Sequence, residues 1–445
     1  MALLYLVCTW AKNNNKTVVA VTVDHNLRKE VKSEIKFISR ICSDLSISHD
    51  VLSWINWGGN GNLQAKARQA RYKLINEWAI ENNIDITIVG PEDPLVLGIT
   101  DKFKSLGLNC FGPSMGAAQL EGSKKFMKDF LIRHNIPTGT FQSFTNAESA
   151  IAHIKSIGCP LVIKADGLAA GKGVTVALEE KEAIRAVQEC LTGNVFGEAG
   201  KKLIVEEFLE GEEASFIVMT DGEIIIPFAS SQDHKARDDN DLGPNTGGMG
   251  AYSPAPVVTK DIHNKIMNEV IIPTVKGMKN EGLNYCGFLY AGVMIDSDNN
   301  LKVLEFNCRF GDPETQPIMM RLDSDIAKLC LEATTGTLKE QSLEWKQATS
   351  LGVVMASGGY PGDYETGKEI LNLPIETENM KVFHAGTSFK KGKTFTSGGR
   401  VLCITALGTN TTEAKEEAYK AVNCIKWENC FYRSDIGYRA VEREK

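Results

Sequence analysis

Residues 164–174 read KADGLAAGKGV, a glycine-rich loop between two short apolar stretches that have the length of strands. Gly171 and Gly173 would let backbone N–H groups approach phosphate oxygens, while Lys164 and Lys172 supply positive charge. The loop is not a Walker A motif, because a valine follows Gly173 where that motif has a lysine. The stretch therefore predicts a phosphate-covering loop between two strands, and a plain hairpin turn is the alternative.

A second stretch downstream, residues 303–315, reads VLEFNCRFGDPET. In a strand, Glu305 and Asn307 point to the same face because side chains alternate. Two oxygen ligands on one face suit a Mg²⁺ ion that is held jointly with nucleotide phosphates. An edge strand with solvated polar residues is the alternative. The apolar neighbours and Arg309 favour the metal site.

Residues 203–213 read LIVEEFLEGEE, an apolar strand that ends in acidic residues. Glu206 and Glu207 would lie at an interdomain hinge, followed by Phe208–Leu209. Backbone groups of such a segment can hydrogen-bond an adenine edge, and Glu213 could accept from ribose hydroxyls. A solvated acidic turn is the alternative for this stretch taken alone.

Residues 230–252, SSQDHKARDDNDLGPNTGGMGAY, form a long polar and glycine-rich segment. A long polar loop within a compact domain is more often functional or disordered than passive. We expect Lys235, Arg237 and the glycine run at 247–250 to clamp an anion, and Asp233 to hold an ammonium group.

The composition limits the classes of function. A chain of 445 residues is expected to form two to four domains. The net charge of −7 gives no general attraction to nucleic acid or to an anionic membrane. Eleven cysteines without a C-x-x-C pair indicate reduced thiols in a cytoplasmic protein rather than a disulfide framework. The apolar start is too short for a membrane span and lacks the basic region of a signal peptide.

The order of predicted elements indicates an α/β protein. Strands are predicted at Thr17–Val23 and Ile84–Val89, with helical spacing from 35 to 45 and at Leu63–Ile80, which is typical of a doubly wound parallel sheet. A helix is predicted at Gly122–Ile136. The other predicted strands lie at 160–164, 173–177, 202–206, 214–219, 223–228, 288–295 and 301–306, and the C-terminal unit has strands at 350–356, 381–384 and 400–407 and a helix at 412–425.

These stretches, in this order, resemble the phosphoribosylamine–glycine ligase family of the ATP-grasp superfamily. The resemblance runs from about residue 84 to residue 445 and implies a multidomain ATP-grasp fold. The strings that carry it are GPE at 90–92, QLEGSK at 119–124, KADGLAAGKGV at 164–174, EEFLEGEEASF at 206–216, SQDHK at 231–235, GPNTGGMGAYSPAP at 243–256, EFNCRFGDPETQP at 305–317, GYPGDY at 359–364, FHAGT at 383–387 and DIGYRA at 435–440.

The resemblance implies a reaction of purine biosynthesis. ATP phosphorylates the carboxylate of glycine, and the amine of 5-phosphoribosylamine attacks the acyl phosphate to give glycinamide ribonucleotide, ADP and phosphate. The enzyme is expected to be a monomer with no nucleic-acid or membrane partner. By similarity, Lys124 and Lys164 contact the ATP phosphates, Gly171, Lys172 and Gly173 cover them, Glu206, Glu207, Phe208, Leu209 and Glu213 hold adenosine, Glu305 and Asn307 bind Mg²⁺ or Mn²⁺, and Asp233, Lys235 and Arg309 line the glycine and acyl-phosphate site.

The N-terminal residues depart from that family, which begins with a strand and a GGREHA-like turn that helps to hold phosphoribosylamine. Residues 1–83 instead resemble the ATP pyrophosphatase domain of the tRNA(Ile)-lysidine synthetase family. The matching strings are MALLYL at 1–6, VTVDHNLRKE at 21–30 and NLQAKARQARYKL at 62–74. That family's SGG-x-DS loop would precede Met1, so we do not expect lysidine formation.

We therefore interpret the chain as a chimera of two families. The expected domains are the fragment 1–83, a remainder of the ligase N-terminal domain at 84–122, an ATP-grasp domain at 123–346 with a lid at about 141–209, and a C-terminal domain at 347–445. The replaced N-terminus leaves a second hypothesis open, a catalytically impaired protein that still binds ATP.

Overall fold

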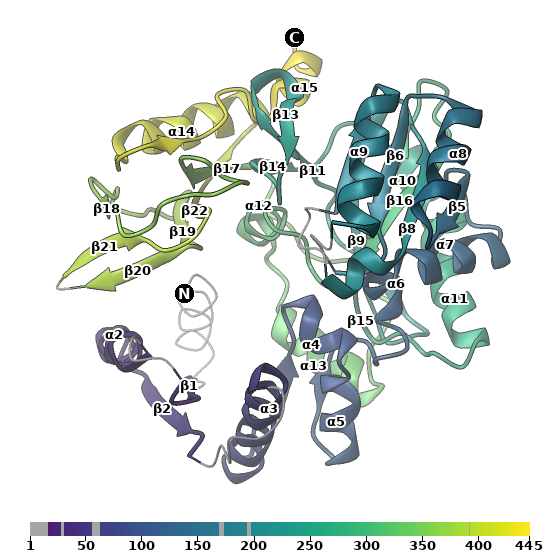
Figure 1. Ribbon diagram of the computed structural model, residues 1–445. Coiled ribbons are helices and arrows are strands. Elements are labelled where there is room, and N and C mark those ends of the chain that lie inside the picture. Colours follow the sequence, from purple (N-terminus) through teal and green to yellow (C-terminus); the bar gives the residue numbers. More distant parts are fainter. Residues whose placement is uncertain (1–16, 28–30, 56–62, 169–172, 194–196, 391) are drawn as a thin grey trace.

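The computed structural model describes residues 17–27, 31–55, 63–168, 173–193, 197–390 and 392–445. Strand β1 (Val19–Asp24) pairs in parallel with β2 (Ser48–Ser53), and helices α2 (Val31–Asp44) and α3 (Leu63–Glu81) pack on this pair. The predicted strand at 17–23 and both predicted helical stretches are confirmed. In Figure 1 this N-terminal part lies at one side of the molecule, below the C-terminal strands.

The next segment contains a second parallel pair, β3 (Thr87–Ile88) with β4 (Cys110–Phe111), and two short helices, α4 (Glu92–Val96) and α5 (Ile99–Ser105). The strand predicted at 84–89 is thus much shorter than expected. In the described part of the chain the two parallel pairs form separate sheets, so the single doubly wound N-terminal sheet is not formed. Strands of two residues provide too few ladder hydrogen bonds to join the two pairs.

A lid-like unit follows and matches the predicted order of elements. Its antiparallel sheet has the order β5-β8-β6-β7 and is packed against α8 and α9 (Figure 1). The elements are β5 (Phe141–Phe144), α8 (Ala147–Ile157), β6 (Leu161–Ala165), β7 (Val174–Ala177), α9 (Glu180–Leu191), η1 (Gly197–Lys201) and β8 (Leu203–Glu207).

The helix predicted at 122–136 is interrupted at its start. Helix α6 (Gln119–Gly122) ends before Ser123, whose extended backbone begins α7 (Lys124–Arg133). The Ser123 hydroxyl accepts a hydrogen bond from the backbone N–H of Phe126 and so caps α7. Lys124 is therefore the first residue of α7, directly after the break.

The central sheet has the order β10-β9-β15-β16 and carries the motif at 305–307. Apolar residues of β9 and β15 are buried on both faces of the sheet, in one core with residues of α5, α7, α10 and α11 and in another with residues of α12 and α13. The elements are β9 (Glu212–Thr220), β10 (Ile225–Pro227), α10 (Lys260–Ile266), η3 (Met267–Ile271), α11 (Ile272–Asn280), β15 (Gly287–Ile295), β16 (Leu301–Asn307), α12 (Thr315–Arg321) and α13 (Ile326–Thr335).

The segment 230–252 is not a plain loop, contrary to the prediction. Strands β11 (Gln232–Asp233) and β14 (Gly250–Ser253) join the sheet β11-β14-β17-β22-β19, and a hairpin of β12 (Ala236–Asp238) and β13 (Leu242–Asn245), with the turn η2 (Asp239–Asp241), projects between them. The sheet therefore extends across the domain boundary that we expected at 346. Strands this short are not recognised by an alternation of apolar and polar residues, and the partner of β14, strand β17, lies about a hundred residues downstream.

The predicted C-terminal strands and helix are confirmed as β17, β19, β22 and α14, whereas four further strands and a last helix among the described residues were not predicted. Helix α14 covers β17 and β22, and the described part of the chain contains no helix that is long and apolar enough to cross a membrane. The elements are β17 (Thr349–Ser357), β18 (Glu369–Ile370), β19 (Met380–His384), β20 (Thr387–Lys390), β21 (Lys393–Thr396), β22 (Arg400–Gly408), α14 (Thr411–Cys424), β23 (Cys430–Phe431) and α15 (Tyr438–Arg443).

Candidate active site

A cavity of about 1300 Å³ opens between the lid sheet, the central sheet and the segment 233–247. Nearly all the site residues expected from the sequence line it, although they come from five separate stretches of the chain. Gly171 and Lys172 lie outside the described residues. The expected residues that line the cavity are Lys124, Lys164, Gly173, Glu206, Glu207, Phe208, Leu209, Glu213, Asp233, Lys235, Glu305, Asn307 and Arg309.

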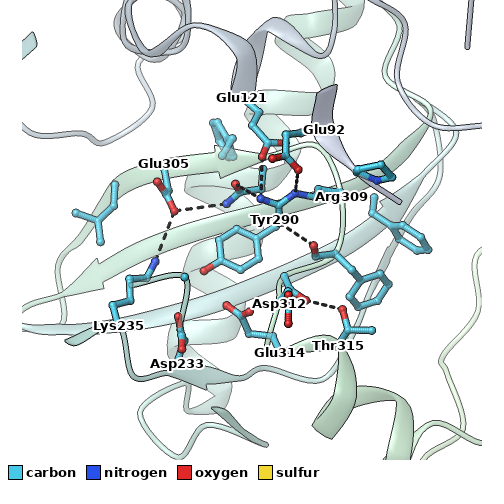
Figure 2. A pocket seen from close by; sticks show the side chains of 18 of the residues that line it. Glu92, Glu121, Asp233, Lys235, Tyr290, Glu305, Arg309, Asp312, Glu314 and Thr315 are labelled. Atoms are coloured by element: carbon cyan, nitrogen blue, oxygen red, sulfur yellow. Dashed lines mark hydrogen bonds and ion pairs between the residues drawn. The ribbon is translucent and has the colours of Figure 1, made fainter. Parts of the chain in front are cut away.

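Glu305 and Asn307 lie on the same face of β16, as their spacing predicted. The Asn307 amide donates to Glu305 Oε1 over 3.5 Å. Figure 2 shows Lys235 beside Glu305, with Nζ 3.5 Å from Glu305 Oε1 and 2.6 Å from Glu213 Oε1. Burial raises the pKa of Glu305, but Lys235 and the neighbouring lysines outweigh it and lower the pKa to about 2. The neighbouring lysines therefore favour the anionic form of Glu305.

The donor set fits a divalent cation that shares its ligands with a nucleotide. Among the described residues no three His, Cys, Asp or Glu side chains gather into a complete metal site. Mg²⁺ at nucleotide sites needs only one or two protein carboxylates, because phosphates and water supply the other oxygens. The charged Glu305 meets that requirement. The Asn307 oxygen accepts from Arg309 Nη2 over 3.4 Å in this structure, so Asn307 would add an oxygen ligand only after its amide turns over.

Arg309 lies between two carboxylates that were not predicted from the sequence to be site residues (Figure 2). Its Nε donates to Glu92 over 2.8 Å, and its Nη2 lies 3.1 Å from Glu121 Oε1. Burial raises the pKa of Glu121 to about 7, although Arg309 and the Cys308 backbone N–H lower it. Both glutamates lie in the quoted strings GPE and QLEGSK, but nothing in a string reveals which cation a carboxylate will meet.

Asp233 faces the cavity from the short strand β11 (Figure 2). Its Oδ1 is buried and has no hydrogen-bond partner within the described ranges. Burial raises its pKa well above the ordinary value, and the neighbouring Glu314 raises it further while Lys235 opposes the shift. A carboxylate of this kind, aimed into a cavity, can accept hydrogen bonds from a small ammonium group.

Part of the expected anion clamp lies away from the cavity. Arg237 is bound by its neighbour Asp238, with an Nε–Oδ1 distance of 2.7 Å, and does not line the cavity, so its predicted role is wrong. Of the glycine run, Gly247 lines the cavity, and Gly248 packs so tightly on Asp233 that a Cβ there would lie 2.7 Å from Oδ1. A Cβ there would also clash with Pro313 Cδ, so Gly248 leaves no room for a side chain between Asp233 and Pro313.

Arg400, at the start of β22, is a further site residue that was not predicted from the sequence. Its Nη1 donates to the carbonyls of Gly247 and Asp312, each over 2.7 Å, and its Nη2 binds the Asp312 carboxylate over 2.8 Å. One C-terminal side chain thus joins the loop before β14 to the loop after β16. No motif spacing signals a contact of this kind.

On the lid side, the Glu206 carboxylate is buried and paired with two lysines. Lys164 Nζ lies 2.6 Å from Glu206 Oε2, and Lys128 Nζ contacts Oε1. The side chain is therefore occupied within the protein, which leaves the backbone of Glu206–Leu209 to meet a ligand. Lys128 lies outside every predicted set, because it sits one turn beyond Lys124 on a helix with no other sign of function.

Three family models together match most of the chain. The phosphoribosylglycinamide synthetase ATP-grasp (A) domain matches residues 122–315, and the C domain of the same synthetase matches residues 350–439. A PP-loop domain matches residues 1–92. The expected change of family along the chain is confirmed.

Curated relatives agree with the larger part. A phosphoribosylamine–glycine ligase of Escherichia coli O157:H7 is 60% identical over 371 residues, which cover 83% of this chain and 86% of the relative. A ligase of the same name from Vibrio vulnificus strain CMCP6 is 58% identical over 369 residues, covering 83% of this chain and 86% of the relative.

Solved structures support the same architecture. The phosphoribosylamine–glycine ligase of Thermotoga maritima superposes with a TM-score of 0.71 at 29% identity and covers 94% of this chain and 100% of that chain. The biotin carboxylase domain of Hydrogenobacter thermophilus 2-oxoglutarate carboxylase, solved with MgADP, has a TM-score of 0.72 at 16% identity and covers 96% and 88% of the two chains. The second likeness shows the ATP-grasp fold alone.

Proposed function

The chain belongs to the phosphoribosylamine–glycine ligase family, and on this premise we propose that it joins glycine to 5-phosphoribosylamine in purine biosynthesis, using ATP. It is a carbon–nitrogen ligase, and its products are glycinamide ribonucleotide, ADP and phosphate. The observation that carries the proposal is the single cavity in which residues from five stretches of the chain meet. The substrates are small molecules, and we place the enzyme in the cytoplasm as a monomer.

The nucleotide end of the cavity lies between the lid and the central sheet. We assign the ATP phosphates to Lys124 and Lys164, with Gly171, Lys172 and Gly173 covering them. Adenine would hydrogen-bond to backbone groups of the hinge residues Glu206, Glu207, Phe208 and Leu209. The Glu213 carboxylate would accept hydrogen bonds from the ribose hydroxyls. Burial lowers the pKa of Lys124, which favours a ligand whose negative charge keeps the ammonium protonated.

Glu305 and Asn307 would hold a divalent cation, Mg²⁺ or Mn²⁺, which would neutralise charge on the β- and γ-phosphates during transfer. Lys235 lies within reach of Glu305 and adds a fixed positive charge at the same end. Together these groups favour transfer of the γ-phosphoryl group to a carboxylate, because the transferred charge needs neutralisation more than covalent help.

The glycine end of the cavity lies around Asp233, Lys235 and Arg309. The Asp233 carboxylate accepts a hydrogen bond from the glycine ammonium group. Lys235 and Arg309 orient the glycine carboxylate, which attacks the γ-phosphorus. The bond from the γ-phosphorus to the β,γ-bridging oxygen breaks and ADP leaves. The amine of phosphoribosylamine then attacks the carbonyl carbon, loses one proton and displaces phosphate. A lid that excludes water protects the acyl phosphate.

The test is a product assay on the whole chain. Purified protein is incubated with ATP, Mg²⁺, glycine and freshly made phosphoribosylamine, and glycinamide ribonucleotide is detected by mass spectrometry. Formation of the product that depends on all four components supports the ligase. ATP binding without product would instead favour the impaired chimera, an alternative that the 60% identity to named ligases does not favour. The domain limits given above, with a lid at about 141–209, are part of the proposal.

A further inference from the structure

A buried group of three charges lies where the lid sheet meets the central sheet, at the cavity wall. Lys128 comes from α7, Glu206 from β8 and Lys164 from β6. The side chains of Lys128 and Glu206 are 0% and 2% exposed. Lys128 also donates to the Thr138 hydroxyl over 2.7 Å, and that hydroxyl donates to the Val303 carbonyl over 3.0 Å. The group therefore ties the lid to the strand that carries Glu305.

The two lysines of this group differ in their access to the cavity. Lys164 lines the cavity, and its Nζ also donates to the Leu304 carbonyl over 3.1 Å. Lys128 is enclosed by protein and does not line the cavity. A ligand phosphate can therefore compete with Glu206 for Lys164, whereas no ligand can reach Lys128.

When one of two cations beside a buried carboxylate binds a ligand instead, the other cation must stay on the carboxylate. An uncompensated charge in a low-dielectric interior is strongly unfavourable. If Lys164 binds the phosphates, Lys128 is the cation that stays on Glu206. Without Lys128, Lys164 would be held by the carboxylate and its charge would be lost to the nucleotide.

We propose that Lys128 is a positioning residue, which neutralises Glu206 so that Lys164 is free to bind the phosphates of ATP. The inference rests on the proposed function, since it requires ATP in the cavity. It assigns Lys128 no contact with substrate.

The charges make the idea testable with three variants, Lys128→Met, Glu206→Gln and the double variant. Dissociation constants are measured by calorimetry for MgATP and for adenosine, which has no phosphate. Lys128→Met should weaken MgATP binding at least about tenfold and leave adenosine binding unchanged, because only phosphate binding needs a free Lys164. The double variant should restore MgATP binding to within about threefold of the parent, since no buried carboxylate then holds Lys164.

A merely structural role for Lys128 gives a different pattern. It would weaken adenosine and MgATP binding alike, or leave the double variant as weak as the single one, and either result overturns the proposal. The control is Lys125→Met on the same helix, whose 37% exposed side chain pairs with Asp129. If Lys128→Met fails to fold, the comparison of Glu206→Gln with the double variant decides, because the proposal predicts nearly equal MgATP affinities for the two. If the parent chain does not bind MgATP, the proposed function is contradicted. If the parent binds MgATP but the double variant does not regain its affinity, only this inference is contradicted.

Discussion

Arg309 Nε donates a 2.8 Å hydrogen bond to the carboxylate of Glu92, which lies 217 residues earlier in the chain. Glu92 is the last residue matched by the PP-loop domain and belongs to the string GPE of the ligase resemblance. The contact therefore connects the short N-terminal remainder of the ligase to the cation of the candidate glycine site.

Replacing Arg309 by methionine should abolish most ligase activity. The change leaves the carboxylates of Glu92 and Glu121 facing each other and removes a cation from the glycine site. Loss of one electrostatic group of this kind lowers turnover about 10²–10³-fold. The measurement is the initial rate of glycine-dependent ADP release. Arg185→Met, on the exposed face of α9, is the control and should keep the parent rate.

The raised pKa of Glu121 should make the free energy of unfolding depend on pH. Its folded pKa of about 7 lies above the ordinary value of 4.5, so the folded chain binds more protons than the unfolded chain between these two values. Stability should then fall as pH rises from 4.5 to 7, by up to roughly 3 kcal/mol from this group.

The measurement is the thermal unfolding midpoint of the parent and of Glu121→Gln between pH 5 and pH 8. The unfolding midpoint of the variant should rise relative to that of the parent as the pH rises, because glutamine cannot ionise. Glu148→Gln, an exposed side chain on α8, should follow the parent at every pH. A constant difference between Glu121→Gln and the parent would contradict an ionising Glu121.

Replacing Glu305 by glutamine should raise the Mg²⁺ concentration needed for half-maximal activity and reduce turnover about 10²-fold or more, because the anionic ligand on β16 is lost. The measurement is a Mg²⁺ titration of ADP release at saturating ATP. Asp298→Asn, in the exposed turn before β16, is matched in charge and should leave the titration unchanged. An unaltered Mg²⁺ requirement in Glu305→Gln would place the cation elsewhere.

Replacing Arg400 by methionine should lower turnover about tenfold or more and leave MgATP affinity within about threefold, because its partners lie near the glycine site. Its hydrogen bonds to Gly247 and Asp312 hold the loops on either side of Asp233. Turnover and calorimetric binding are compared in the same preparation. Lys393→Met, an exposed residue of β21, is the control. Equal losses of turnover and of MgATP affinity would contradict the prediction that Arg400 supports the glycine site and not the nucleotide site.

The N-terminal part should be the first to be cut by a protease. Its described residues up to 83 contribute only Val31, Cys42, Ala67 and Ala79 as buried apolar side chains, which bury little surface. Limited trypsin digestion followed by mass spectrometry should show early cuts before residue 84 and a persistent fragment that begins near there. Early cuts within the central sheet would contradict this expectation.

The sequence determined those features that depend on neighbouring residues. The two-residue period of a strand placed Glu305 and Asn307 on one face, and the order of strand, glycine loop and strand predicted the lid elements β6 and β7. The quoted strings also marked the change of family along the chain, which the family models confirm.

Only the tertiary structure decided how these segments meet. Arg309 finds Glu92 and Glu121, Glu206 finds two lysines, and β14 pairs with a strand about a hundred residues downstream. Such contacts depend on long-range packing and on which buried charges must be neutralised together. Secondary-structure propensity and motif spacing are local signals and do not predict these contacts. The sequence therefore determined the chemistry available to the site, and the fold decided which groups act on one another.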